Sequence, residues 1–534
     1  MLDEEVYASE MEGVGKRRLA NVISVLLPAR EYRLECSWTT ERPLPAIEEF
    51  ACRLILMMES ASPGELQAYF GLSKLETDGL VGSLARNRLV DVADDGVLLP
   101  SAILRAKQIA IGEVPTFTTF ETREEDAVFD LLALQLVPRR SYSNSRFGLP
   151  EVPMPELAKS VAPDRIAEAF SEQSRAFLEF SRGRTKENFK THLYKVARCR
   201  PMRTLQVPVD MEISLDVGAT GDLNVHRDAV ERLGENRKRP LSIELESKVA
   251  DYLASESLPK ATTSFSDFCA LVEDEVLARY VREDEFDLSK WLRDRDANKT
   301  GYGSQLTRGL LGPIYLVGNR TTLINMLRSE EHEEEHEEER SSIAHWLPAD
   351  VPFWAANNTE LVEFVAKFQK ALDRRDGGRL VTCFKGEGTS EERWLKKKFH
   401  SRLPHAVMFT GGIQLDRFEL LVVPERFAVA QYHVQPSKMS AVTLPIGYAT
   451  TDPDRVDRIT RLLAQRLAST VSPSISWSTD SQHVQSLIDF NLLGIAEVAR
   501  PKPSETARES GATHIALTEK PRPKIYIKRS KFYS

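Results

Sequence analysis

Ser62-Pro63-Gly64-Glu65 and, eleven residues later, Ser73-Lys74-Leu75-Glu76 both have the pattern of a helix start. In each, a serine at the N-cap and a glutamate three residues on satisfy backbone N–H groups that the first helical turn leaves unpaired. Gly71 lies between them, where a short helix is expected to end in a left-handed residue. The sequence therefore predicts two consecutive helices joined by a tight turn.

The segments on either side extend this unit. An apolar helix is predicted over Ile47–Glu59. After the second helix, Leu89–Val92 and Val97–Leu99 flank Asp94-Asp95-Gly96, as the strands of a small hairpin do. The order helix, helix–turn–helix, hairpin resembles a winged helix, which we expect at residues 41–103.

The resemblance to a winged helix implies DNA binding, with the second helix in the major groove. Lys74, Arg86 and Arg88 are its candidate phosphate ligands. Glu76 and Asp78 lie near the groove-facing end of the same helix and repel phosphate. A winged helix that docks a protein is therefore an equal alternative.

Length and composition are those of a soluble multidomain protein. A chain of 534 residues is too long for one core. Hydrophobic residues make up 42%, and no apolar run reaches the length of a membrane helix. The five cysteines are far apart and have no metal-ligand spacing. We expect a cytoplasmic protein with neither a cofactor nor a metal.

Charge is segregated along the chain, although the net charge is only −8. Eight basic residues and one acid lie between Arg182 and Arg203, and five basic residues and no acid between Arg393 and Arg402. Six more basic residues lie in the last fifteen positions. Aromatic side chains are interleaved with both clusters, among them Tyr194 and Trp394.

Such clusters favour nucleic acid as partner, because cations contact phosphates and flat rings stack on bases. The alternative is a solvated basic helix face. We expect DNA in first place, with protein partners through the winged helix and no membrane. The predicted nucleic-acid-binding residues are Arg182, Arg184, Lys186, Lys190, Lys195, Arg198, Arg200, Arg203, Lys396, Lys397, Lys398, Lys74, Arg86 and Arg88.

The remaining periodicity places further elements. We predict helices over 124–135, 156–200 and 241–295, the last with caps at Ser242 and Ser266, and strands over 205–209 and 211–217. From about residue 310 strands and helices alternate, which predicts a mostly parallel sheet covered by helices. Its elements are strands at Pro313–Gly318 and Leu380–Phe384, and helices from Thr359 and Ser390.

The expected fold class is therefore a multidomain α/β chain. A helix and a strand occupy 1–40, the winged helix 41–103, and a mixed helical and β middle region 104–300. An α/β domain follows at 305–475, and an extension with a basic tail at 476–534.

Part of the C-terminal domain resembles one repeat of the phospholipase D-like superfamily. The resemblance covers the strand at 405–409, the hairpin at 418–430, and the strand and helix that begin at 444 and 454. The family's H-x-K-x-x-x-x-D motif would fall on Arg417, Glu419 and Pro424, none of which matches. The resemblance implies a degenerate domain that kept a sheet but lost the catalytic residues.

One segment matches a zinc signature. His332-Glu333-Glu334-Glu335-His336 has the H-E-x-x-H spacing. It lies within eight glutamates between Glu330 and Glu339, with no apolar residue to pack a helix over a metal. We expect a solvated charged segment, and a zinc hydrolase is the alternative.

Three classes of function are consistent with these features. The first is a nonenzymatic nucleic-acid-associated protein, such as an accessory component of a bacterial defence or DNA-processing system, or a ligand-sensing transcriptional regulator. The second is an enzyme, either a divergent phosphodiesterase or nuclease of the phospholipase D-like class or a zinc hydrolase. The third is a scaffold that binds only proteins.

Overall fold

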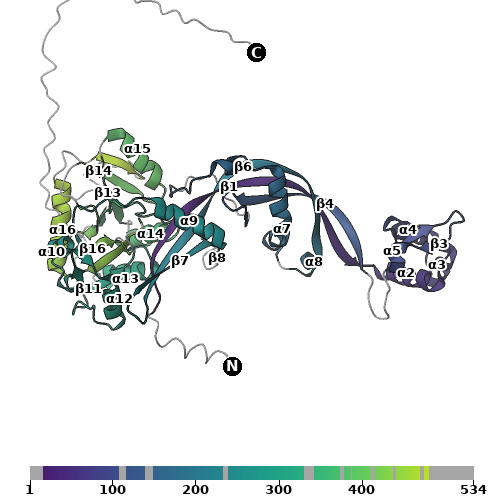
Figure 1. Ribbon diagram of the computed structural model, residues 1–534, viewed down its shortest axis with the longest axis horizontal. Helices are drawn as coiled ribbons and strands as arrows, with labels where there is room; N and C mark the ends of the chain where they lie inside the picture. Colours follow the sequence, from purple (N-terminus) through teal and green to yellow (C-terminus); the bar gives the residue numbers. More distant parts are fainter. Residues whose placement is uncertain are drawn as a thin grey trace, which may run out of the picture.

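The chain is a mixed α/β protein with two large sheets. The computed structural model describes residues 16–106, 116–138, 148–183, 185–232, 238–329, 342–372, 378–386, 388–410, 415–436, 441–468, 474–479 and 487. Figure 1 shows a body, a curved arm that leaves it, and a small helical unit at the far end of the arm. Residues 44–106 are called the tip unit below.

A single long strand links these parts. Strand β1 (Arg18–Pro43) has 26 residues and, at ~3.3 Å per residue, extends about 85 Å. It pairs antiparallel with β4 (Thr116–Asp130) on one side and β6 (Thr191–Val217) on the other. The six-stranded sheet has the order β5-β4-β1-β6-β7-β8, with β5 at Leu136–Val137, β7 at Leu223–Arg232 and β8 at Lys238–Pro240.

Several predictions for this region were wrong. Residues 124–130 belong to β4 and form no helix, since Val128 and Phe129 are buried on opposite faces of the sheet. The helical prediction also fails beyond residue 190, where β6 begins, and 205–209 and 211–217 are one strand. Within the described part of 1–40, from residue 16, only strand β1 occurs. In all these places the long-range partner strand overrides a local periodicity.

The arm consists of the outer parts of β4, β1 and β6, covered on one face by α7 (Pro163–Arg182). Alternate residues of β1 point toward α7, and Trp38 packs edge-on against Phe170 at 6.3 Å and stacks on Phe177 at 6.5 Å. Two short helices flank α7, namely α6 (Glu156–Lys159) and α8 (Lys186–Phe189). The opposite face of the three strands has no helix over it among the described residues.

The tip unit has the predicted elements. Helix α2 (Ala46–Met58) precedes α3 (Pro63–Phe70) and α4 (Lys74–Arg86), and the hairpin of β2 (Val90–Val92) and β3 (Leu98–Pro100) follows, then α5 (Ala102–Ala106). Both capping boxes are present, and Gly71 is left-handed with φ 67°. Each glutamate accepts the backbone N–H of its N-cap serine, which lowers the pKa of Glu65 and Glu76.

The body contains an eight-stranded sheet in the order β11-β17-β16-β15-β12-β13-β14-β18. Only β12–β13 and β13–β14 pair in parallel, so the prediction of a mostly parallel sheet was wrong. On one side of these three strands, β15, β16 and β17 follow in antiparallel pairs. On the other side, β18 pairs antiparallel with β14. The strands are β11 (Thr307–Leu311), β12 (Ile343–Leu347), β13 (Arg379–Lys385), β14 (His405–Phe409), β15 (Phe418–Val423), β16 (Phe427–Val434), β17 (Leu444–Thr450) and β18 (Ser474–Ser478).

Helices cover both faces of this sheet. One face packs on α13 (Val317–Ser329), α14 (Glu360–Leu372) and α15 (Gly388–Phe399). The other packs on α9 (Ile243–Ser255), α10 (Phe265–Leu271), α11 (Glu275–Ala278), α12 (Leu288–Asp296), α16 (Pro453–Ala468) and the base of the six-stranded sheet. A two-stranded ladder, β9 (Val281–Arg282) and β10 (Glu285–Phe286), interrupts the helices predicted over 241–295.

Two local predictions in the body were wrong. The cap of α10 is Ser264 and not Ser266, since the Ser264 hydroxyl accepts the N–H of Asp267. Pro313–Leu316 is a turn that leads into α13, which begins at Val317; Ile314, Tyr315 and Leu316 are buried as a strand's residues would be, whereas Val317 is exposed. The predicted cap at Ser242, the strand at Leu380–Phe384 and the helices near Thr359 and Ser390 are confirmed.

Phe170→Ala is expected to destabilise the arm by about 3–5 kcal/mol, because it removes the ring that packs α7 against Trp38. Hydrogen–deuterium exchange of β1 and β6 in the arm should become faster, while the body stays protected. Leu157→Ala is the control, since this side chain is 89% exposed and should change stability by no more than about 0.5 kcal/mol. Unchanged exchange in Phe170→Ala would contradict the assigned packing.

Candidate nucleic-acid interface

The uncovered face of the arm collects residues from three strands. Side chains that pair across strands point to the same face, so the register defines its rows. Asp126, Arg33 and Arg200 form one row, and Glu124, Glu35 and Arg198 form the next. Ser37 and Thr122 lie in a third row with Lys195. We call this surface the open face.

Three predicted cations on β6 lie on the open face and make no ion pair with the described residues. Lys195, Arg198 and Arg200 are exposed, and none makes an ion pair within the described parts of the chain. Lys190 is exposed at the turn before β6 and is likewise unpaired there. These four side chains are therefore available to an external anion.

Aromatic rings lie beside these cations. Phe120 of β4 is the partner of Thr39, and Tyr194 lies at a bulge of β6 next to the pair Ser37–Lys195. The two rings meet edge-to-face at 5.5 Å across β1 and are 66% and 63% exposed. Phe120 was not predicted from the sequence, although the run of threonine and phenylalanine at Thr116–Phe120 is typical of a strand.

Some cations of the arm are paired with acids, on the open face and on the covered face, and others are not. Arg33 donates to Asp126 at 2.9 Å, and Arg203 donates to Glu31 at 2.8 Å. Arg182 at the end of α7 is paired with Glu125 on the covered face. Arg182 and Arg203 thus have internal partners, and these two predicted contacts are the least available to nucleic acid.

The structure does not describe the side chains of two predicted residues of the cluster at 182–203. Arg184 lies outside the described residues, and for Lys186 only the backbone is described. The His332–His336 motif and the basic tail of the last fifteen residues also lie outside the described ranges.

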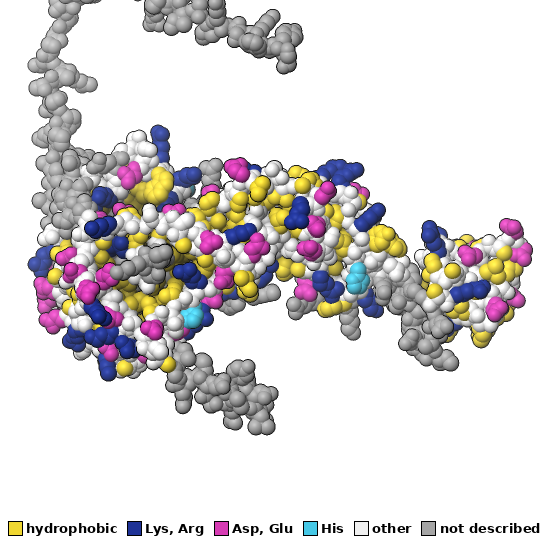
Figure 2. All heavy atoms as spheres, viewed as in Figure 1, with side chains coloured by type: hydrophobic (Ala, Val, Ile, Leu, Met, Phe, Trp, Pro, Cys, Tyr) yellow, Lys and Arg dark blue, Asp and Glu magenta, His cyan; other side chains and the backbone are white. Residues whose placement is uncertain are grey.

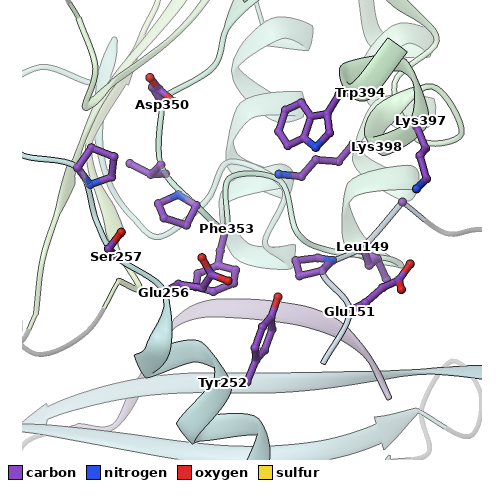
Figure 3. Close-up of a pocket in the computed structure, with 15 residues that line it drawn as sticks. Leu149, Glu151, Tyr252, Glu256, Ser257, Asp350, Phe353, Trp394, Lys397 and Lys398 are labelled. Atoms are coloured by element: carbon purple, nitrogen blue, oxygen red, sulfur yellow. The ribbon is translucent and has the colours of Figure 1, made fainter. Parts of the chain in front are cut away.

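The second basic cluster splits between surface and interior. Lys396 and Lys397 are exposed on α15, whereas Lys398 is half-buried, and Lys397 and Lys398 line a cleft of about 490 Å³ (Figure 3). Lys398 extends over the Trp394 ring, with Nζ 4.7 Å from the ring centroid. Burial, together with the nearby Arg402, lowers the pKa of Lys398 to about 8.

Arg402, counted with this cluster from its sequence position, is a structural residue. It is 6% exposed and donates to the backbone carbonyls of Ala355, Asn357 and Lys398, and to that of Gly148 at 3.0 Å. Gly148 has φ +65° and approaches the end of α15 so closely that a Cβ would lie 2.1 Å from the Lys398 carbonyl oxygen. The guanidinium therefore joins α15, the loop after β12 and the segment that leads to the arm.

The cations of the tip unit are sparse. Lys74, Arg86 and Arg88 are exposed, and Arg86 donates back to the Gly82 carbonyl at 3.0 Å. Residues 44–106 contain nine Asp and Glu against five Lys and Arg, a net charge of −4. Figure 2 shows acidic and hydrophobic side chains side by side on this unit. The exposed apolar residues include Phe50, Met57 and Leu75, the last 83% exposed.

Of the three positions on which the H-x-K-x-x-x-x-D motif would fall, Glu419 belongs to a buried polar chain. Glu419 accepts from the Trp346 indole at 2.9 Å and lies 2.7 Å from Nε2 of His433, whose Nδ1 lies 2.9 Å from the Thr443 hydroxyl. Glu419 and His433 are 2% and 4% exposed. With both histidine nitrogens engaged, this chain satisfies its own hydrogen bonds within the core.

Neither the comparison with protein-family models nor the comparison with curated proteins gave a match for this chain. Within the described residues no helix has both the length and the apolar character needed to cross a membrane. Those residues also contain no group of three metal-ligating side chains placed to bind an ion. Function has to be inferred from the surfaces described above.

Arg402→Met is expected to lower the free energy of unfolding by at least about 2–3 kcal/mol, because several buried carbonyls lose their donor. Hydrogen exchange should accelerate at residues 148–152 and 355–358. Arg393→Met, on the exposed side of α15, is the matched control. Equal stability of the two variants would show that Arg402 does not join these segments.

Proposed function

We propose that the chain is a nonenzymatic nucleic-acid-associated protein that binds the sugar–phosphate backbone along the open face of the arm. The observation that carries this proposal is the set of unpaired cations Lys195, Arg198 and Arg200 beside the exposed Phe120–Tyr194 pair. Unpaired cations replace the counterions of phosphate, and exposed rings stack on bases. The Phe120–Tyr194 pair favours a segment with unpaired bases over a closed duplex.

The tip unit, in this proposal, is a winged helix that docks protein. Its element order and two capping boxes support the winged-helix assignment. Its net charge of −4 and its exposed Phe50, Met57 and Leu75 favour a protein partner over phosphate. A winged helix placed about 85 Å along β1 from the start of the strand holds such a partner away from the body.

The body, in the same proposal, is a degenerate phospholipase D-like domain that contributes structure and no nucleophile. The hydrogen-bonded Glu419 and His433 support this, because both are buried and engaged. Such a protein fits an accessory role in a defence or DNA-processing system, in which other subunits supply catalysis.

Replacing Lys195, Arg198 and Arg200 together by glutamate is expected to weaken binding of an oligonucleotide by about tenfold or more. The slope of log K against log salt should fall by about 2–3 units, since three phosphate contacts are lost. Fluorescence anisotropy of the full chain with single-stranded DNA, duplex DNA and RNA, between about 50 and 300 mM salt, measures both.

The matched control reverses three cations on the tip unit, Lys74, Arg86 and Arg88. Its affinity should stay within about twofold of the unchanged protein. A loss equal to that of the arm variant would assign nucleic acid to the winged helix instead. Binding by the arm variant with unchanged affinity and slope would refute the open face as the interface.

A further inference from the structure

The cleft beside α15 is a second candidate site, separate from the open face. It has two connected cavities of about 490 and 440 Å³, which share Asp350, Val351, Trp394 and Lys398. These volumes are in the range of small-molecule sites. Its walls include the loops that follow β12 and β13, at the carboxyl ends of parallel strands, where α/β sheets bind ligands.

Lys398 supplies a cation without a counterion at the centre of the cleft. Figure 3 shows its side chain extending from α15 into the space that Trp394, Phe353 and Asp350 surround. It is half-buried, and no carboxylate of the described chain lies within ion-pair distance of its Nζ. A partly desolvated ammonium without a partner favours an anionic group in the cleft.

A further aromatic ring lines the second cavity. The Trp354 side chain is 5% exposed and packs edge-to-face against Phe384 and Phe399. The positive charge beside this apolar wall comes from Lys398, which favours an occupant with an anionic group, such as a phosphate.

The aromatic walls and the acidic rim of the cleft further restrict the class of ligand that fits it. Trp394 is 56% exposed, and Tyr252 and Phe353 meet edge-to-face at 6.3 Å below it. Such walls accept a planar ring. Glu256 and Asp350 on the rim are exposed acceptors for amino and hydroxyl groups. Phosphate, planar base and sugar hydroxyls occur together in a nucleotide.

We propose that this cleft binds a mononucleotide, with its phosphate on Lys398 and its base against the aromatic walls. The site is walled by the body and by the base of the arm. Tyr252 comes from α9, and residues 148–151 are tied to β1 by Leu26, whose N–H donates to the Pro150 carbonyl at 2.8 Å. A bound nucleotide therefore contacts the body and, at the same time, the segment that is tied to the base of β1.

Isothermal titration calorimetry of the full chain with AMP, ATP, adenosine and inorganic phosphate tests the site. AMP or ATP should bind with a dissociation constant below about 1 mM, and adenosine and phosphate alone about tenfold or more weakly. Lys398→Met and Trp394→Ala should each weaken nucleotide binding about tenfold. Lys398→Arg retains the cation and should retain binding.

Lys396→Met is the matched control, since Lys396 is exposed on the same helix and does not line the cleft. Circular dichroism melting of each variant verifies folding, and Trp394 is exposed enough to be replaced without loss of the core. No nucleotide binding at about 1 mM, or equal affinities of Lys398→Met and Lys396→Met, would overturn the proposal. The triple glutamate variant of the open face should bind AMP normally, which separates this site from the proposed nucleic-acid interface.

Binding at this site is expected to weaken as the pH rises from 7 to 9, because Lys398 has a pKa lowered to about 8 and loses its charge in this range. Below that pKa the ammonium is present and holds the phosphate. The charged groups around it are Asp350, Glu256, Glu151, Glu391, Lys385, Lys397 and Arg402. Titrations of Lys398→Arg should show a flat profile over this range, because a guanidinium stays protonated. Parallel profiles for the two proteins would contradict the role of Lys398.

Discussion

The pairing of β1 with both β4 and β6 is the constraint on which the rest of the structure depends. A 26-residue strand in solution would expose a row of unpaired backbone groups on each side. Here β6 pairs with one side of the strand, β4 pairs with the other side from Ala29 onward, and Ser24 and Leu26 on that side bond to Ala356 and Pro150. The same strand begins in the body, forms the centre of the arm and ends at the tip unit. The distance of the tip unit from the body thus follows from the pairing of one strand.

The base of β1 is anchored to the body by buried hydrogen bonds from its backbone and side chains as well as by apolar packing. The Ser24 N–H donates to the Ala356 carbonyl at 2.7 Å, and the Asn21 amide donates to the Thr443 carbonyl at 3.0 Å. Arg402 joins the neighbouring loop to residue 148 from the other side. Buried donors of this kind are costly to leave unpaired, so they define one arrangement of arm and body. The nucleotide cleft lies at this junction.

The basic side chains of the clusters at 182–203 and 393–402 have different environments, although the two clusters have similar compositions. On β6 the strand holds Lys195, Arg198 and Arg200 toward solvent, opposite the face that α7 covers. On α15 the helix turns Lys398 inward, and Arg402 just after it is buried against carbonyls. Partnered guanidinium groups stabilise the fold, and unpartnered cations are available for ligands. Composition alone does not distinguish the two cases.

The sequence by itself determined the elements whose signals are local. Ser62 and Ser73 with their N3 glutamates predicted two helix starts, because a cap depends on residues within a few positions. The hairpin expected at 418–430 is present as β15 and β16. Only the tertiary structure decided that residues 124–130 are a strand, that β6 carries the basic cluster, and that Phe120 meets Tyr194. Each of these depends on β1 as a partner roughly 80 or more residues away in the sequence, and no local pattern encodes such a pairing.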